Sequence, residues 1–175
     1  MTMTDDVILV DEADREIGTM EKLEAHRRGL LHRAFSIFLF SPDGQCLLQR
    51  RAAGKYHSGG LWSNACCSHP RPGEDMAAAT ARRLEEEIGV RCPLRKVLEI
   101  AYDLDVGGGM REAEYNHTYL GVLDAGVPLT PAPEECSACQ WRPVAEIERE
   151  LATAPEAYSP WFVLLFPKVL AARSP

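Results

Sequence analysis

The chain has 175 residues, a length typical of one domain, and its 46% content of hydrophobic residues is enough to fill a single core. No apolar run approaches the roughly 20 residues of a membrane-spanning helix. The first residues are acidic and lack the basic and apolar segments of a secretory signal, so we expect a cytoplasmic protein that does not bind membranes. The net charge of -7 argues against nucleic acid as a partner.

The charge is distributed unevenly along the chain. Residues 1–21 carry one basic and seven acidic side chains, residues 22–96 carry thirteen and seven, and residues 97–175 carry five and twelve. The three regions therefore have net charges of -6, +6 and -7. A basic middle segment in an acidic protein predicts a localised site for an anion.

The first half of the chain predicts short strands, a helix and a hairpin. Residues 7–10 are typical of a strand and residues 21–28 of a short helix. The β-rich runs over residues 33–40 and 45–51 are separated by Ser41-Pro42-Asp43-Gly44, a strong turn sequence. We therefore expect these two runs to form a hairpin.

The second half predicts helices and further strands. A rigid loop over residues 70–73 precedes a helix over residues 76–88, which is rich in Ala, Arg, Leu and Glu and ends at Gly89. The remaining predictions are strands over residues 94–102 and 112–123, a strand that begins or ends at Trp141, and helices over residues 143–151 and 160–172. Together these elements predict an α+β fold in a single domain over residues 1–175, with a mixed sheet of mostly antiparallel hairpins flanked by helices.

Arginine and glutamate residues crowd the helix over residues 76–88. Arg82 and Glu86, and likewise Arg83 and Glu87, are four residues apart, a pattern that a solvated helix with surface ion pairs also produces. With the residues before it, the helix resembles the Nudix box, through Ser68-(x5)-Glu74-(x7)-Arg82-Arg83-Leu84-Glu85-Glu86-Glu87-Ile88-Gly89-Val90. In that family the glutamates hold Mg²⁺ against a diphosphate.

Two positions depart from the box. Ser68 stands where the family has its first glycine, and Arg83 stands where it has a glutamate. The second departure removes a metal ligand and adds a cation, so the box favours a site that binds a diphosphate over one that hydrolyses it. A Nudix hydrolase of a nucleotide-linked diphosphate, using Glu74, Glu86 and Glu87, is the alternative. A catalytically inert ligand-binding module is a third hypothesis.

A second resemblance covers residues 7 to about 165. Its residues, in chain order, are Lys22-(x3)-His26-(x5)-His32-(x2)-Phe35, Arg50-Arg51-(x3)-Lys55, Trp62-Ser63-Asn64-(x2)-Cys67-Ser68-His69-Pro70, Glu112-Ala113-Glu114 and Ser159-Pro160-Trp161. This order resembles the type 1 isopentenyl-diphosphate isomerases, so we expect a Nudix-like fold with a core over about residues 30–153 and added elements at both ends. Two details differ. The interval from His26 to His32 is one residue shorter than usual, and Ser68 replaces a common glycine.

The resemblance implies two metal sites. The first would be formed by three histidines and two glutamates, namely His26, His32, His69, Glu112 and Glu114. Imidazole and carboxylate ligands suit Mn²⁺, Zn²⁺ or Fe²⁺ better than Mg²⁺. The second site would hold Mg²⁺ between Glu87, the backbone carbonyl of Cys67 and the substrate diphosphate, because Mg²⁺ prefers oxygen ligands.

The implied reaction interconverts isopentenyl and dimethylallyl diphosphate by adding one proton and removing another, through a tertiary carbocation. The resemblance assigns the proton transfers to Cys67 and to Glu114, with Tyr102 beside Glu114. Nearby cations and metal are expected to favour the thiolate of Cys67. Trp161 would place its ring face against the carbocation.

Four basic residues are the candidates for binding the diphosphate, namely Lys22, Arg51, Lys55 and Arg83. Because side chains alternate along a strand, only one of Arg50 and Arg51 is expected to reach the site, and Cys66 is expected to point away from it. We expect a small-molecule diphosphate as the substrate and a monomer or weak homodimer.

Overall fold

Strand β3 (His32–Phe40) runs through the centre of a nine-stranded mixed sheet in the computed structural model, which describes residues 5–173. On one side β3 pairs in parallel with β8 (Met110–Val122), and on the other it pairs antiparallel with β6 (Cys66–Ser68). Residues 34–40 are all buried, because both faces of the sheet are covered. This explains why β3 has an almost continuous apolar run instead of an alternating pattern.

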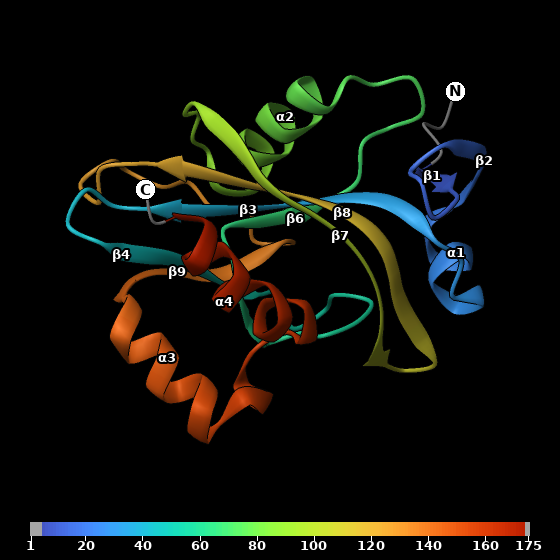
Figure 1. Cartoon of the computed structure of the whole chain (residues 1–175). Helices are drawn as coiled ribbons and strands as arrows, with labels where there is room; N and C mark the ends of the chain where they lie inside the picture. Colours follow the sequence, from blue (N-terminus) through green and yellow to red (C-terminus); the bar gives the residue numbers. More distant parts are fainter. Residues whose placement is uncertain (1–4, 174–175) are drawn as a thin grey trace.

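Helices cover both faces of this sheet (Figure 1). Helix α2 (Met76–Ile88) lies on one face, where its apolar side chains share a core with Phe35 and Ile37. Helix α4 (Pro160–Arg173) lies on the other face and shares a second core with Phe38. Alternate side chains of β3 therefore pack into two separate cores, which holds the strand between the two helices.

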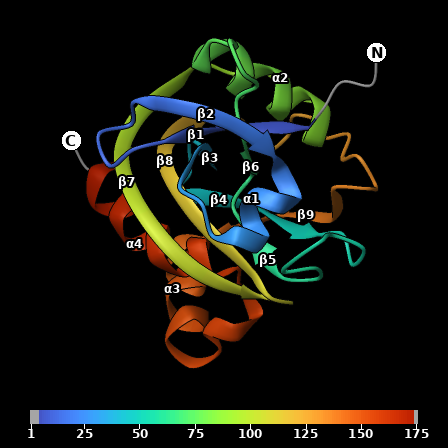
Figure 2. The ribbon, with the colours of Figure 1, turned by 90° about the vertical axis from the view of Figure 1, so that its right-hand side faces the viewer.

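The N-terminal segment forms a hairpin at one end of the sheet (Figure 2). Strands β1 (Asp6–Val10) and β2 (Glu16–Glu21) pair antiparallel, and β1 also contacts β3. The sequence predicts β1 but not β2, because β2 is an exposed edge strand whose largest apolar residue, Ile17, is solvent-exposed. No buried face therefore imposes an alternating pattern on it.

Helix α1 (Lys22–Arg28) follows the hairpin and has a local cause for each of its ends. The carboxylate of Glu21 accepts hydrogen bonds from two backbone N–H groups of the first turn. Gly29 ends the helix in the left-handed conformation, with a φ of 60°. The helix is thus held at a length that places His26 in its last turn, where the ring is fully buried.

Strand β4 (Gln45–Arg51) joins β3 only at the turn of the predicted hairpin. The two strands share a single register pair, Phe40 with Cys46, after which β6 takes the place beside β3. Beyond this point β4 pairs with β9 (Cys136–Pro143) and with β5 (Trp62–Ser63), of which β5 was not predicted by the sequence. Trp141 lies inside β9, so the prediction that it begins or ends a strand is wrong.

Two C-terminal helices close the fold, as the sequence predicts. Helix α3 (Val144–Thr153) starts directly after Pro143, and a short 3-10 helix, η1 (Pro155–Ala157), leads to α4. The backbone N–H of Ser159 donates to the carbonyl of Trp62 over 2.8 Å, and the Ser159 hydroxyl lies 2.9 Å from that of Ser63. These contacts fix the start of α4 against β5. No helix among residues 5–173 is long and apolar enough to cross a membrane.

Strands β7 (Leu94–Gly107) and β8 form a long hairpin that reaches past the sheet toward α1 and α4 (Figure 1). Both strands extend closer to the glycine turn than predicted, because Gly108 and Gly109 make the tight reversal between them with positive φ values. The register places Tyr102 opposite Glu114. This pairing puts a phenol beside a carboxylate in the site described below.

Helix α2 has the predicted bounds, and its C-terminus is held by a distant loop. Gly89 ends the helix with a φ of 74°. The free carbonyls of Glu87 and Ile88 accept hydrogen bonds from Ala132 and Thr130, each 2.9 Å long. The segment after β8 therefore crosses the end of the helix on its way to β9.

Replacing Gly89 by alanine should destabilise this junction. A Cβ atom there would lie 2.9 Å from Cβ of Thr130 and closer still to its hydroxyl, while a Cβ at Gly109 would meet nothing within 4 Å. Both positions have positive φ, a conformation that costs an alanine about 1–2 kcal/mol. We therefore expect Gly89→Ala to lower the free energy of unfolding in urea by about 1 kcal/mol or more beyond Gly109→Ala. Equal losses would show that the loop adapts without cost.

Candidate active site

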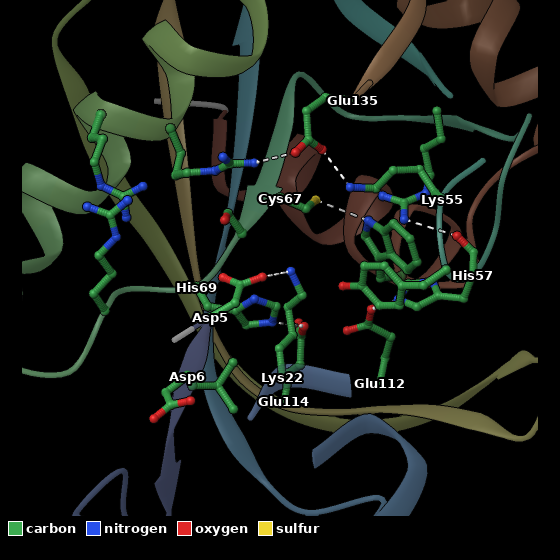
Figure 3. Close-up of a pocket in the computed structure, with 18 residues that line it drawn as sticks. Asp5, Asp6, Lys22, Lys55, His57, Cys67, His69, Glu112, Glu114 and Glu135 are labelled. Atoms are coloured by element: carbon green, nitrogen blue, oxygen red, sulfur yellow. Dashed lines mark hydrogen bonds and ion pairs between the residues drawn. The ribbon is translucent and has the colours of Figure 1, made fainter. Parts of the chain in front are cut away.

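A polar pocket opens between β1, α1, β6, α2 and the first residues of β8, and Figure 3 shows the side chains that line it. The loop after β4 and the first turn of α4 close its other side. Its lining combines basic side chains with carboxylates, histidines and one thiol, drawn from Asp5, Asp6, Val7, Lys22, Arg51, Lys55, Tyr56, His57, Cys67, Ser68, His69, Arg71, Arg82, Arg83, Glu112, Glu114, Glu135 and Trp161. The basic side chains of the predicted anion site therefore line the same pocket as acidic side chains and histidines.

The three histidines and two glutamates of the expected metal site form one cluster. One ligand atom from each of His26, His32, His69, Glu112 and Glu114 lies within 4.8 Å of all the others. The parallel register of β3 and β8 sets His32 directly opposite Glu114. Between His26 and His32 the chain leaves α1 at Gly29 and enters β3, which brings both rings to the cluster.

Two of these histidines present a free ring nitrogen to the cluster. Nδ1 of His26 lies 2.6 Å from the carbonyl oxygen of Lys22, and Nδ1 of His32 lies 2.8 Å from that of Leu30. A carbonyl oxygen only accepts hydrogen bonds, so each Nδ1 carries a proton, and in the neutral ring each Nε2 then has a lone pair to offer. Both Nε2 atoms are buried and have no hydrogen-bond partner among residues 5–173. Such orphaned acceptors fit a metal ion.

Burial controls the protonation of the cluster. It lowers the pKa of His32 to about 4 and the pKa of His69 well below its ordinary range, so both rings are neutral at pH 7, the form that binds metal. Burial and the adjacent charge of Glu112 raise the pKa of Glu114 well above its ordinary value. Although burial opposes it, the hydrogen bond from Glu114 holds the pKa of Glu112 well below the usual range. Without a metal the two carboxyl groups thus share one proton.

Glu114 is also held by a network on its outer side. The hydroxyl of Tyr102 donates to Oε2 of Glu114 over 2.6 Å, and the Asn116 amide donates to the same oxygen over 3.3 Å. The Asn116 amide also lies 3.0 Å from the hydroxyl of Ser36. Because Ser36 lies 3.4 Å from the sulfur of Cys67, a continuous polar chain joins the carboxylate to the thiol.

Cys67 faces the pocket, whereas its neighbour Cys66 is in the core beneath α2, as strand alternation predicts. The Cys67 thiol donates to Oδ1 of Asn64 over 3.1 Å and accepts from Nε1 of Trp161 over 3.1 Å. Burial raises the pKa of Cys67 to about 12, against the effect of Ser36 and Asn64. The protein's own groups thus favour the neutral thiol, and the expected thiolate would depend on the positive charge of a bound metal.

The four basic residues expected to bind a diphosphate all line the pocket. Lys22 pairs with Asp5, and Lys55 pairs with Glu135 over 2.6 Å. The guanidinium of Arg51 lies over the ring of Trp161, 5.0 Å from its centroid. Arg50, the neighbour of Arg51, is exposed, as expected.

Arg83 bonds to three carboxylates. It lies 3.1 Å from Glu135, 2.8 Å from Glu86 and 2.5 Å from Oε1 of Glu87. The other oxygen of Glu87 accepts from the Gln49 amide over 2.9 Å. Glu87 is buried behind Arg83 and does not line the pocket, and burial raises its pKa although Arg83 opposes the shift.

Glu74, which the alternative hydrolase would need, is already engaged by Arg82. The guanidinium of Arg82 bonds both Glu74 oxygens over 2.7 and 2.8 Å, and the Glu74 carboxylate also accepts from the backbone of Arg71. Glu86 lies partly in solvent between Arg82 and Arg83. Arginines therefore neutralise these box carboxylates.

Sequence reasoning missed several polar residues of the site, among them His57, Glu135 and Asn116. Nε2 of His57 lies 2.5 Å from Oε1 of Glu112, and Glu135 bridges Lys55 and Arg83. The only signal for His57 was its position two residues after Lys55 in a chain with five histidines. Glu135 lies far along the chain from both of its partners, so no local pattern marks it.

Comparison with known proteins agrees with this geometry. A NUDIX domain model matches residues 30–162, so the chain belongs to the Nudix family. Among solved structures, a protein of Deinococcus radiodurans superposes with a TM-score of 0.77 at 18% identity and covers 93% of this chain and 98% of its own. A MutT protein of Methanosarcina mazei superposes with a TM-score of 0.65 at 16% identity, covering 83% of this chain and 96% of its own. These likenesses establish the fold.

Curated relatives are more similar in sequence. The isopentenyl-diphosphate Delta-isomerase 2 of Aromatoleum aromaticum is 47% identical, with 98% of this chain and 90% of the relative covered. The isopentenyl-diphosphate Delta-isomerase of Pectobacterium atrosepticum is 45% identical, covering 94% of this chain and 90% of the relative. Within the Nudix family, the chain is therefore a member of the isopentenyl-diphosphate Delta-isomerases.

Metal binding to the histidine and glutamate cluster should stabilise the fold measurably. Protein stripped with a chelator is expected to melt at a lower temperature than protein given Mn²⁺ or Zn²⁺, because free metal at 100 times its Kd contributes about 2.7 kcal/mol. Scanning calorimetry measures the shift. In the His32→Gln variant, most of this metal-dependent rise in melting temperature should be absent. If the melting temperature of the unchanged protein did not depend on added metal, the cluster would not be a metal site.

Proposed function

We propose that the protein interconverts isopentenyl diphosphate and dimethylallyl diphosphate through a protonated intermediate, as the names of its relatives indicate. One observation carries the proposal at the level of residues. A neutral thiol, Cys67, and a carboxylate, Glu114, line the same pocket beside a set of basic side chains. An isomerisation that adds a proton to an alkene and removes another needs such a pair of groups on one substrate.

In these two steps one of Cys67 and Glu114 would donate a proton and the other would accept one. Burial raises the pKa of both groups, to about 12 for Cys67, so each holds a proton unless a nearby cation lowers its pKa. The substrate's terminal alkene carbon would take up one proton, and a proton on the carbon beyond the cation would leave to the opposite group. Tyr102, 2.6 Å from Glu114, stabilises the carboxylate between transfers. In the reverse direction the two groups exchange roles.

The carbocation formed between the two transfers needs stabilisation and protection from water. Trp161 is buried at the pocket wall, with its N–H fixed on Cys67. The Arg51 guanidinium already lies over this ring, an arrangement in which a cation is attracted to an aromatic face. A ring held in this way would contribute about 2 kcal/mol to a desolvated cation.

Lys22, Arg51, Lys55 and Arg83 are the proposed diphosphate ligands. Three of them are paired with Asp5 or Glu135 in the structure, so these carboxylates occupy the place that the diphosphate would take. A diphosphate oxygen would replace the carboxylate at each cation. Arginine can bind two such oxygens at once, whereas lysine acts as a point charge.

The proposal includes two divalent ions. In the cluster of His26, His32, His69, Glu112 and Glu114, Mn²⁺ or Zn²⁺ would supply the positive charge that replaces the shared proton and keeps Glu114 able to accept one. Mg²⁺ would accompany the diphosphate at Glu87 and the Cys67 carbonyl. Because Arg83 now occupies Oε1 of Glu87, that site requires Arg83 to turn toward the diphosphate.

Deuterium labelling tests the reaction itself. Isopentenyl diphosphate incubated with the protein and Mg²⁺ in D₂O should yield dimethylallyl diphosphate that carries deuterium in a methyl group, because the added proton comes from the solvent pool. NMR detects the label. Release of phosphate or a nucleoside monophosphate from a panel of nucleotide-linked diphosphates, without an allylic product, would instead favour the hydrolase.

Substitution of the two proton-transfer groups should abolish this labelling while the fold survives. Cys67→Ser and Glu114→Gln are each expected to lower kcat by at least about 100-fold, since general acid–base catalysis contributes about 10²–10⁴-fold. Cys92→Ala is the control, because Cys92 lies outside the pocket lining. Near-normal rates in either variant would eliminate that residue as a proton-transfer group.

A further inference from the structure

The loop between β4 and β5, residues 52–61, has a strained and tightly bonded backbone. Ser58 has a φ of 52°, which is rare for a residue with a side chain. A Cβ at Gly59 would lie 2.6 Å from the carbonyl oxygen of Ala53, so only glycine fits there. Hydrogen bonds between Arg51 and residues 60 and 61 close the base of the loop over 3.0 and 2.9 Å. Strain of this kind persists where the surrounding structure imposes it, often beside a functional group.

The side chain that this backbone presents is His57, whose ring is buried in the wall of the pocket (Figure 3). Its Nε2 lies 2.5 Å from Oε1 of Glu112, closer than the 3.5 Å between Nε2 of His26 and the same oxygen. This buried nitrogen makes no hydrogen bond of regular geometry among residues 5–173, so its close approach to Glu112 is a contact between an imidazole nitrogen and a carboxylate oxygen. On the opposite ring edge, Nδ1 lies 3.3 Å from the hydroxyl of Ser58, the strained residue.

Two further contacts tie His57 to the rest of the pocket. The carbonyl oxygen of His57 accepts a hydrogen bond from Arg51 over 3.0 Å, and the ring meets Trp161 edge to face, with centroids 5.6 Å apart. His57 therefore contacts Glu112, Arg51 and Trp161 at once. It is not part of the set of five whose ligand atoms lie mutually within 4.8 Å.

We propose that His57 is a positioning residue for Glu112, which fixes this carboxylate toward the metal cluster from outside the ligand set. The Nε2–H of His57 would donate to Oε1 of Glu112, the oxygen that also lies 3.5 Å from Nε2 of His26, and would so hold the carboxylate beside the metal cluster. This inference rests on the metal site of the proposed function and adds a residue to its supporting shell. Removal of such an outer partner typically costs about 10- to 100-fold in metal affinity or activity.

The experiment compares Mn²⁺ affinity among matched variants, measured by electron paramagnetic resonance of free Mn²⁺. His57→Phe keeps a flat ring against Trp161 but removes the donor, so the Kd for Mn²⁺ should rise about 10- to 100-fold. His57→Gln keeps an N–H of similar reach, so its Kd should stay close to that of the unchanged protein. Should His57→Phe not fold, His57→Asn, which is too short to reach Glu112, has the same expected loss.

His117→Gln is the control for the loss of a buried histidine. Its Nε2 lies 2.9 Å from Asp14, a similar pair with a carboxylate but outside the pocket lining. This variant is expected to melt earlier and to bind Mn²⁺ unchanged. In the isomerase assay, His57→Phe should lower kcat with little change in KM, because the Arg51 contact uses the backbone of residue 57.

Each outcome separates this inference from the proposed function. Weaker Mn²⁺ binding in His57→Phe, restored in His57→Gln, supports the positioning role whatever the substrate proves to be. Equal Mn²⁺ affinity in all His57 variants, with only the melting temperature lowered, overturns it and leaves the metal cluster and the isomerase intact. An unchanged protein that binds no Mn²⁺ overturns the inference together with the metal site on which it rests.

Discussion

The burial of two neighbouring carboxylates on β8 is the constraint to which the rest of the site responds. Glu112 and Glu114 are only 5% and 6% exposed, and a buried carboxylate without compensation costs several kcal/mol. Histidines approach from α1, β3 and the segment after β6, while Tyr102 and Asn116 bond Glu114 from behind. A one-residue slip of β8 against β3 would turn both carboxylates to the opposite face. The pocket can therefore keep its two carboxylates only if β8 keeps this register against β3.

The sequence predicts the bounds of a helix or strand well where neighbouring residues, such as capping residues, determine where it begins and ends. Helix α2 has the predicted bounds because Asp75 caps its start and Gly89 its end. Strands β2, β5 and β6 were missed, because two- and three-residue strands and an exposed edge strand leave no periodic pattern. The parallel pairing of β3 with β8 joins segments about eighty residues apart, and nothing in either segment records that partner.

The candidate site was predictable to a different extent. The resemblance supplied the candidate metal cluster and the four basic residues. The structure gathers the five candidate ligands into one cluster, three of which line the same pocket as the four basic residues. The resemblance could not supply the protonation of Cys67, because the pKa of a thiol depends on how deeply it is buried. Nor could it supply Glu135, since the Lys55 partner is eighty residues away and the pair forms only in the folded chain.

The carboxylate of Glu135 would compete with an anionic ligand for two cations of the pocket. One carboxylate, carrying a single charge, spans Lys55 and Arg83 together. The net binding free energy of an incoming anion is its attraction to the two cations minus the attraction of Glu135, which it must displace. A singly charged anion adds little, whereas a diphosphate offers several charged oxygens and can satisfy both cations at once. With the diphosphate bound as proposed, the pocket would therefore discriminate against singly charged anions, because each would have to displace Glu135 from the two cations.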